Sequence, residues 1–266
     1  MANLGWLDVT EIDFNALLLL ETLHIRYLAE QKPSQSMGTA LAAHPAVQWY
    51  LEKIYPPIAD FIGLCLAMAY PDPSKEELRK TELEVLGGMQ DWLIYLLAPE
   101  RYDRLEFLAW DDRSLLSMAD FSGKVILDIG SGTGRLAFAV APSAKVVYAV
   151  EPVANLRRYL WHKRDQMKVN NVYPVDGAID QIPFPDNFAD ILMAGHVFGE
   201  QPEKEYQEMQ RVVRQSGWIL LHPGTNADSE DDSHRFLIAQ GFEFGHFTEP
   251  GEGLKRKYWK KNQKKP

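Results

Sequence analysis

A glycine-rich turn directly follows the short apolar run Val125–Ile129 in this 266-residue chain. Glycines at 130, 132 and 134 let the backbone turn sharply and place no Cβ in the way of a ligand. The turn leads into an expected helix at 135–141, and a helix N-terminus favours negatively charged ligand groups. Strand, turn and helix together predict a site for a small ligand at this point of the chain.

Two carboxylates lie at the ends of predicted strands at this place. Asp128 stands two residues before the first glycine, and Glu151 comes directly after the run Val146–Val150. A carboxylate beside the turn would repel a pyrophosphate but attract the ammonium group of a ligand. An acid at the tip of a second strand is placed to accept hydrogen bonds from both ribose hydroxyls of a nucleoside. These positions indicate a nucleoside ligand that carries positive charge.

The elements that position these residues form a repeating pattern after residue 122. Short apolar runs alternate with helical stretches, which implies a mostly parallel sheet with helices on both faces. A Pro-Gly turn between the last two runs predicts an antiparallel hairpin at the sheet edge. The expected α/β fold is therefore Rossmann-like with seven strands. These strands are 125–129, 146–150, 172–175, 191–194, 218–222, 242–248 and 255–261, and the intervening helices are 135–141, 154–169 and 203–215.

The first 120 residues carry no strand pattern. Apolar residues recur at helical spacing, for example over 11–31, and Ser74 with Glu77 forms a capping box that starts another helix. We therefore expect two parts. Residues 1–120 would form an all-helical cap for substrate binding or homodimer contact, and residues 121–266 a ligand-binding α/β domain.

The α/β part resembles the class I S-adenosylmethionine-dependent methyltransferases, in particular the small-molecule group related to quinone-biosynthesis enzymes. The resemblance rests on 125–139 (VILDIGSGTGRLAFA), on Glu151, and on 175–191 (VDGAIDQIPFPDNFADI). In the last segment Ile182-Pro183-Phe184 matches a Leu-Pro-Phe step of the family. The likeness covers roughly residue 122 to the C-terminus. It implies a Rossmann-like domain that binds S-adenosylmethionine and releases S-adenosylhomocysteine.

The resemblance also implies roles for individual residues. The glycine turn would hold the methionine part of the cofactor, and Glu151 the ribose. The acid that usually holds the adenine falls on Ala178, so we expect backbone atoms of Ala178 and Ile179 to take that role. The implied cofactor-binding residues are Asp128, Gly130, Ser131, Gly132, Gly134, Glu151, Pro152, Ala178, Ile179 and Ala194.

His196 is the candidate catalytic residue, because the family places the loop after strand four nearest the reactive methyl group. It would contact the acceptor or act as a general base, which is needed only when the acceptor must lose a proton. The alternative is a loop histidine that only shapes the cofactor pocket. His222 ends strand five and could face the same cleft, although a polar strand-end residue without a catalytic task is the preferred interpretation.

Composition limits the other classes of function. The single cysteine, Cys65, excludes a disulfide framework and a Cys-built metal site, and we expect no metal. No apolar run is long enough to cross a bilayer, and the N-terminus has no basic segment typical of a signal peptide. The sequence therefore predicts a cytoplasmic protein without a membrane partner.

Charge is unevenly distributed. The net charge is −9, and residues 254–266 carry seven basic residues and no acid, so the rest stands at −9 − 7 = −16. An acidic body repels nucleic acid, so a nucleic-acid partner is not expected. The basic C-terminal segment nevertheless keeps an RNA or protein methyltransferase as one alternative.

The sequence thus predicts methyl transfer from S-adenosylmethionine to a small-molecule acceptor by in-line displacement. An NAD(P)-dependent oxidoreductase is a second alternative, because Gly132, Gly134 and Ala137 also satisfy G-x-G-x-x-A. A non-catalytic scaffold of the same fold is a third, because Ala178 replaces the usual acid. Asp128, the segment 175–191 and the terminal hairpin favour the methyltransferase.

Overall fold

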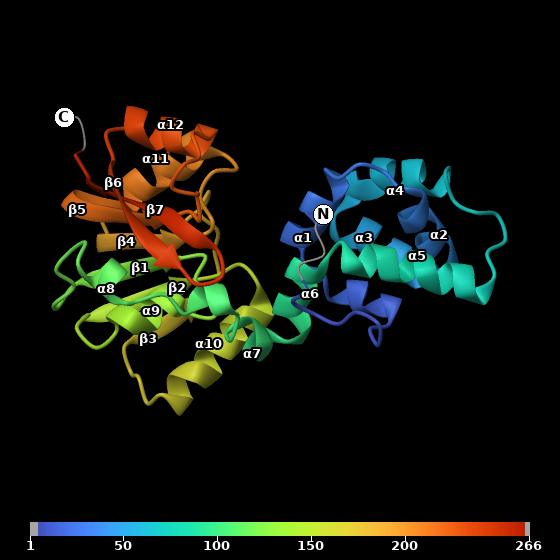
Figure 1. Cartoon of the computed structure of the whole chain (residues 1–266), viewed down its shortest axis with the longest axis horizontal. Coiled ribbons are helices and arrows are strands. Elements are labelled where there is room, and N and C mark those ends of the chain that lie inside the picture. Colours follow the sequence, from blue (N-terminus) through green and yellow to red (C-terminus); the bar gives the residue numbers. More distant parts are fainter. Residues whose placement is uncertain (1–4, 264–266) are drawn as a thin grey trace. The chain divides into compact units, whose positions relative to one another are not determined.

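The structure is a computed structural model that describes residues 5–263, and the chain divides into two compact units, Met1–Tyr102 and Asp103–Pro266 (Figure 1). The division falls earlier than the predicted boundary after residue 120. The reason is that Trp110 and Leu115 share a buried apolar cluster with residues of the sheet unit. Residues 103–120 therefore belong to the α/β unit, and the predicted boundary was placed too late.

Helices make up the described part of the first unit, residues 5–102, in which no strand occurs. Ser74 and Glu77 form the predicted capping box: Ser74 Oγ accepts from the Glu77 N–H at 3.2 Å, and Glu77 Oε2 from the Ser74 N–H at 2.8 Å. The elements are η1 Phe14–Leu19, α1 Thr22–Ala29, α2 Gln35–Ala43, α3 Pro45–Ile54, η2 Pro56–Ile58, α4 Ala59–Leu66, α5 Lys75–Gly87, α6 Gln90–Leu97 and α7 Pro99–Tyr102.

The single helix expected over 11–31 is two elements, η1 and α1. Leu20 between them has extended backbone angles. The Glu21 N–H donates to His24 Nδ1 at 3.2 Å, which starts a new helix at Thr22. Helical spacing of apolar residues continued across this local cap, so the spacing alone did not reveal the break.

The second unit is a seven-stranded sheet in the order β3-β2-β1-β4-β5-β7-β6. β1 to β5 pair in parallel, and β7 pairs antiparallel with both β5 and β6, which confirms the predicted fold class. The strands are β1 Val125–Ile129, β2 Val146–Val150, β3 Val172–Val175, β4 Ala189–Gly195, β5 Val213–His222, β6 Glu243–Glu249 and β7 Gly253–Lys261. The first three strands have the predicted bounds.

Helices cover both faces of this sheet. On one face α8, α9 and α10 contribute Leu115, Leu136 and Leu160 to a buried cluster with Ile126 of β1. On the other face α11 and α12 bury apolar side chains against Leu127 and its neighbours. The helical elements of this unit are η3 Glu106–Leu108, α8 Arg113–Leu116, α9 Arg135–Val140, α10 Ala154–Gln166, α11 Pro202–Val212 and α12 Asp232–Ala239.

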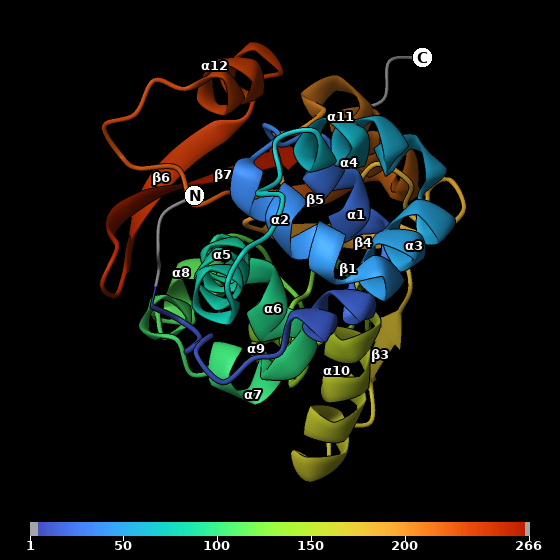
Figure 2. The ribbon, with the colours of Figure 1, turned by 90° about the vertical axis from the view of Figure 1, so that its right-hand side faces the viewer.

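The β6–β7 hairpin lies beside α12 (Figure 2). His234 of α12 is joined to Tyr258 of β7 by a 3.0 Å hydrogen bond between Nδ1 and the phenol oxygen, and Tyr258 is fully buried. The basic C-terminal segment of the sequence is therefore a folded strand over most of its length. Within residues 5–263, no helix is both long and apolar enough to cross a lipid bilayer.

Candidate active site

The carboxyl ends of four strands bring most of the predicted site residues to one edge of the sheet. Ile129 of β1 is the register partner of both Val150 and Ala194, and Gly195 is the partner of His222. The turns that follow β1, β2, β4 and β5 therefore lie next to one another. In open α/β sheets this edge is where ligands bind.

The glycine turn is held rigidly by hydrogen bonds. The N–H groups of Gly130 and Ser131 donate to Val150 O at 2.8 and 3.1 Å, and Ser131 Oγ donates to Asp128 O at 2.7 Å. Gly130 has a φ of 65°, and a Cβ there would lie 2.2 Å from Cγ1 of Val197. Both the backbone angle and the neighbouring side chain therefore require glycine at this position.

Asp128 lies inside the protein, with 1% of its surface exposed. Its Oδ2 accepts the N–H of Ala137, in the first turn of α9, at 3.0 Å. Its Oδ1 is buried and has no hydrogen-bond partner among the described residues. Burial raises the pKa of Asp128 to about 7, against the hydrogen bonds with Ser131 and Ala137, which lower it. The carboxylate expected at the mouth of the strand is thus a desolvated group with one unsatisfied acceptor oxygen.

Glu151 joins the turn after β1 to the start of α10. Its Oε2 accepts the Gly132 N–H at 2.8 Å, and its Oε1 accepts the Val153 N–H at 2.9 Å. Arg157 donates to the backbone oxygens of Glu151 and Pro152 at 2.8 and 2.7 Å, which fixes this loop. Glu151 is itself buried, with 4% of its surface exposed.

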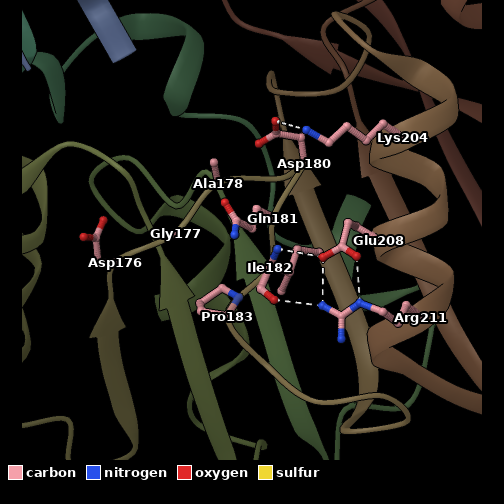
Figure 3. A pocket seen from close by; sticks show the side chains of 10 residues that line it. All are labelled: Asp176, Gly177, Ala178, Asp180, Gln181, Ile182, Pro183, Lys204, Glu208 and Arg211. Carbon is pink, nitrogen blue, oxygen red and sulfur yellow. Dashed lines mark hydrogen bonds and ion pairs between the residues drawn. The ribbon is translucent and has the colours of Figure 1, made fainter. Parts of the chain in front are cut away.

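Ala178 and Ile179 lie in the loop after β3, and a cavity of about 840 Å³ opens beside that loop (Figure 3). The loop reaches the same edge because the Glu151 N–H donates to Val175 O at 3.0 Å. Asp176, at the start of the loop, is 73% exposed and pairs with Arg157 at 2.9 Å. The remaining predicted residue, Ala194, is buried in β4 next to β1.

A charged pair on α11 holds this loop, and the sequence analysis missed it. Glu208 Oε2 accepts the Ile182 N–H at 2.9 Å, and Arg211 donates to Ile182 O at 2.9 Å (Figure 3). Arg211 also donates to Phe184 O at 2.7 Å. Arg211 also donates to Glu208 at 2.7 Å, which lowers the pKa of Glu208. The spacing of three residues on a predicted helix was the available signal.

His196 follows β4 with a φ of 58°, a left-handed angle that is uncommon for a residue with a side chain. Its Nε2 lies 2.8 Å from Oε1 of Glu249, at the end of β6. Its backbone N–H donates to His222 O at 2.8 Å, and the Phe107 ring lies 5.6 Å away. The His196 side chain is 40% exposed, whereas that of Glu249 is 1% exposed. Nothing in the sequence pointed to Glu249, because the hairpin signal did not indicate what its ends approach.

His222 does not reach an open cleft. Its ring is stacked 5.1 Å from Trp110 and lies 5.1 Å from Phe247, and both ring nitrogens lack hydrogen-bond partners among the described residues. Burial lowers the pKa of His222 to about 3, so the ring is neutral. This surrounding fits a strand-end residue without a catalytic task.

Comparisons with known proteins agree with this geometry. Residues 127–221 match the family described as "Methyltransferase domain". An uncharacterised methyltransferase of Geobacillus thermodenitrificans is 30% identical over 155 residues, which cover 57% of this chain and 68% of that protein. One of Geobacillus kaustophilus is 28% identical over 185 residues, which cover 66% and 82%.

A solved structure has the same fold. It is a chain of the complex between the Trm112 methyltransferase activator of Haloferax volcanii and a methyltransferase. It superposes with a TM-score of 0.55 at 12% identity, over 67% of this chain and 97% of the other. Sequence and fold together define the class: this chain belongs to the class I S-adenosylmethionine-dependent methyltransferases. The methyltransferase prediction is thereby confirmed over the oxidoreductase alternative.

Proposed function

We propose that this protein transfers a methyl group from S-adenosylmethionine to a small-molecule acceptor at the carboxyl edge of the sheet. The observation that carries the proposal is the buried Oδ1 of Asp128, which lacks a partner and lies beside a turn fixed by Glu151. A desolvated acceptor oxygen is stabilised by a charged donor such as the ammonium group of an amino acid. Bound S-adenosylmethionine supplies an electrophilic methyl carbon on a positively charged sulfur.

The residues at the edge fit this ligand by chemistry. Asp128 would accept from its ammonium group, and the turn containing Gly130, Ser131, Gly132 and Gly134 would line its methionine part. Glu151, next to Pro152, would accept from the ribose hydroxyls. Backbone atoms of Ala178 and Ile179 would contact the adenine beside the loop held by Arg211.

The acceptor side is assigned to the turn after β4. Ala194 ends the buried part of that strand, and His196 projects a half-exposed ring beside it. We assign His196 the catalytic role there. The chain would mainly align acceptor and donor and exclude water, since the sulfonium is already an activated leaving group.

A small acceptor is favoured over RNA or protein because the expected basic tail is engaged within the fold. Lys255 donates to Asn226 at 2.8 Å, Lys257 to Ser114 O at 2.5 Å and Lys260 to Tyr206 at 2.5 Å. Arg256 donates to Glu230 at 3.0 Å. These four charges are neutralised or held by the protein itself, which weakens their attraction for a phosphate backbone.

Titration calorimetry tests the cofactor assignment. S-adenosylhomocysteine should bind and NADH should not. Asp128→Asn should weaken S-adenosylhomocysteine binding about 10- to 100-fold, the effect of losing a hydrogen bond to a charged group. Asp120→Asn, at an exposed aspartate before β1, is the matched control and should leave the affinity unchanged. Equal binding by both variants would contradict the assignment of Asp128.

A further inference from the structure

The contact between His196 and Glu249 joins two turns that are far apart in the sequence. His196 comes from the end of β4, and Glu249 from the end of β6, the outermost strand of the sheet. Glu249 is almost completely buried, yet its Oε1 lies 2.8 Å from the imidazole Nε2. Burying the charge of a carboxylate carries a large desolvation penalty, so a contribution to folding stability does not explain why Glu249 is buried against a half-exposed imidazole.

The charges around this pair are few and can be named. Lys255 of β7 places its Nζ 4.0 Å from the second oxygen of Glu249, and Glu252 lies 3.6 Å from the same ammonium group. His222 of β5, whose backbone oxygen accepts the His196 N–H, is neutral because burial lowers its pKa to about 3. Lys255 thus supplies a compensating charge within the fold, and the His196 side chain is 40% exposed whereas the Glu249 side chain is buried.

The contact determines which ring nitrogen is the base. When Glu249 accepts this hydrogen bond, Nε2 carries the proton. In the neutral ring Nδ1 then holds the lone pair, and no described residue forms a hydrogen bond with it. Glu249 therefore positions His196 with its basic nitrogen free, as a carboxylate does for a catalytic histidine.

Gly224 lies against the Nδ1 edge of the ring, where a larger residue would not fit. A Cβ on Gly224 would lie 2.5 Å from Nδ1 of His196, and φ at Gly224 is 76°. The left-handed backbone at His196 is a second constraint on the direction of the ring. Backbone strain of this kind persists where the surrounding structure enforces it.

We propose that His196 and Glu249 form a catalytic dyad in which His196 is the general base. The dyad deprotonates a phenolic or enolic hydroxyl, so that the protein is an O-methyltransferase. This inference rests on the methyl transfer proposed above. The hydroxyl proton moves to Nδ1 of His196, an oxygen–carbon bond forms to the methyl group, and the carbon–sulfur bond breaks. The positive charge of the sulfonium ends on the imidazolium, and a neutral thioether leaves.

The chemistry of the base favours an acceptor that carries a weakly acidic proton. A phenol or enol lies within a few pKa units of an imidazole, whereas an alkyl alcohol is too weak an acid for it to deprotonate. An amine attacks through its own lone pair and needs no base before attack. The Phe107 ring, 5.6 Å from the imidazole, offers an apolar wall for a flat acceptor.

Nitrogen NMR tests the positioning without any turnover. In the protein with S-adenosylhomocysteine, long-range proton–nitrogen spectra should show His196 as the Nε2–H tautomer, with His196→Gln providing the assignment. Glu249→Gln should mix the tautomers, and Glu252→Gln, on the same hairpin but 56% exposed, should not. An Nδ1–H tautomer in the wild type, or one insensitive to Glu249→Gln, would overturn the proposal.

Product analysis tests the acceptor class. The full chain is incubated with trideuteromethyl S-adenosylmethionine and a panel of catechols, phenols, enols, amines and thiols, together with a protein-free extract of the source cells. A labelled methoxyl product is the expected result. Label on nitrogen, sulfur or carbon would overturn the O-methyl proposal while leaving methyl transfer intact. No labelled product, despite S-adenosylhomocysteine binding, would instead refute the proposed function and with it this inference.

Kinetics with the labelled acceptor separate the two roles. His196→Gln should lower kcat by about 10²–10⁴-fold, the usual contribution of a general base. Glu249→Gln should lower kcat about 10- to 100-fold with KM within twofold, and Glu249→Asp should recover part of the loss. The His196→Gln loss should shrink at pH values above the acceptor's own ionisation, because a phenolate needs no base. A loss that stays constant over that pH range would contradict the base role.

Discussion

Burial controls the chemistry of Asp128. Its carboxyl group is 1% exposed, and one oxygen has no partner among the described residues, so the ionised form is stabilised poorly in the free protein. A ligand ammonium group would reverse this by supplying the missing donor. The same residue is therefore expected to lower stability in the free protein and raise affinity in the complex, a common trade-off at functional sites.

The pH dependence of stability follows from this burial. The Asp128 pKa rises from 3.8 to about 7 on folding, so between these values the folded protein holds a proton that the unfolded chain releases. Stability should therefore fall as pH rises from about 4 to 7, and Asp128→Asn should remove that component. Thermal melts of both proteins across this range provide the measurement. A difference in melting temperature between the two proteins that stays the same at every pH would contradict this prediction.

Gly130 gives a steric prediction. Gly130→Ala places a Cβ 2.2 Å from Val197 Cγ1 at a positive φ, which should destabilise the turn by about 1–2 kcal/mol or more and reduce S-adenosylhomocysteine affinity. Adding Val197→Ala should recover the steric part only. Gly63→Ala, in α4 with open space around it, is the control and should not destabilise. Calorimetry and thermal melts distinguish these outcomes.

Among the elements, the parallel strands were the most predictable. β1, β2 and β3 have the predicted bounds because a buried strand needs an unbroken apolar run, and such runs are visible in the sequence. The positions of the glycine turn, Glu151 and His196 at one edge followed from the same alternation. Contacts between distant turns did not, since the burial of Asp128 and the approach of Glu249 depend on packing.

The loop after β3 depends on α11 for its shape. Arg211→Met should release Ile182 and Phe184, increase amide hydrogen exchange over 177–184, and weaken S-adenosylhomocysteine binding several-fold. Arg235→Met, at a more exposed arginine of α12, should change neither. If exchange in the loop stayed at the wild-type level, the α11 pair would not be what orders it.

At the scale of the molecule, the role of the helical unit stays a proposal. We propose that it caps the acceptor site or forms a homodimer contact, and its exposed apolar residues support a contact role. Trp49 is 64% exposed, Leu64 59% and Tyr70 50%. Contiguous apolar patches mark interaction surfaces, so these exposed side chains are the ones to substitute in a test of the contact.

Sedimentation tests the homodimer. Trp49→Glu should shift the protein towards the monomer if this unit forms the contact, because a charge would be buried without a partner. Trp161→Glu, at an exposed tryptophan of α10 in the other unit, should leave the sedimentation coefficient unchanged. A wild-type protein that sediments as a monomer at all concentrations would leave only the cap role.

The carboxylate that orients His196 belongs to a strand with a neighbour on one side only. Strands at such a margin open locally before the centre of a sheet does. Fraying of this strand would break the hydrogen bond between Glu249 and His196 while the parallel strands still held the nucleoside. Low concentrations of urea should therefore abolish turnover before they abolish S-adenosylhomocysteine binding. The difference between the urea midpoints of these two losses would measure the local stability of the last hairpin.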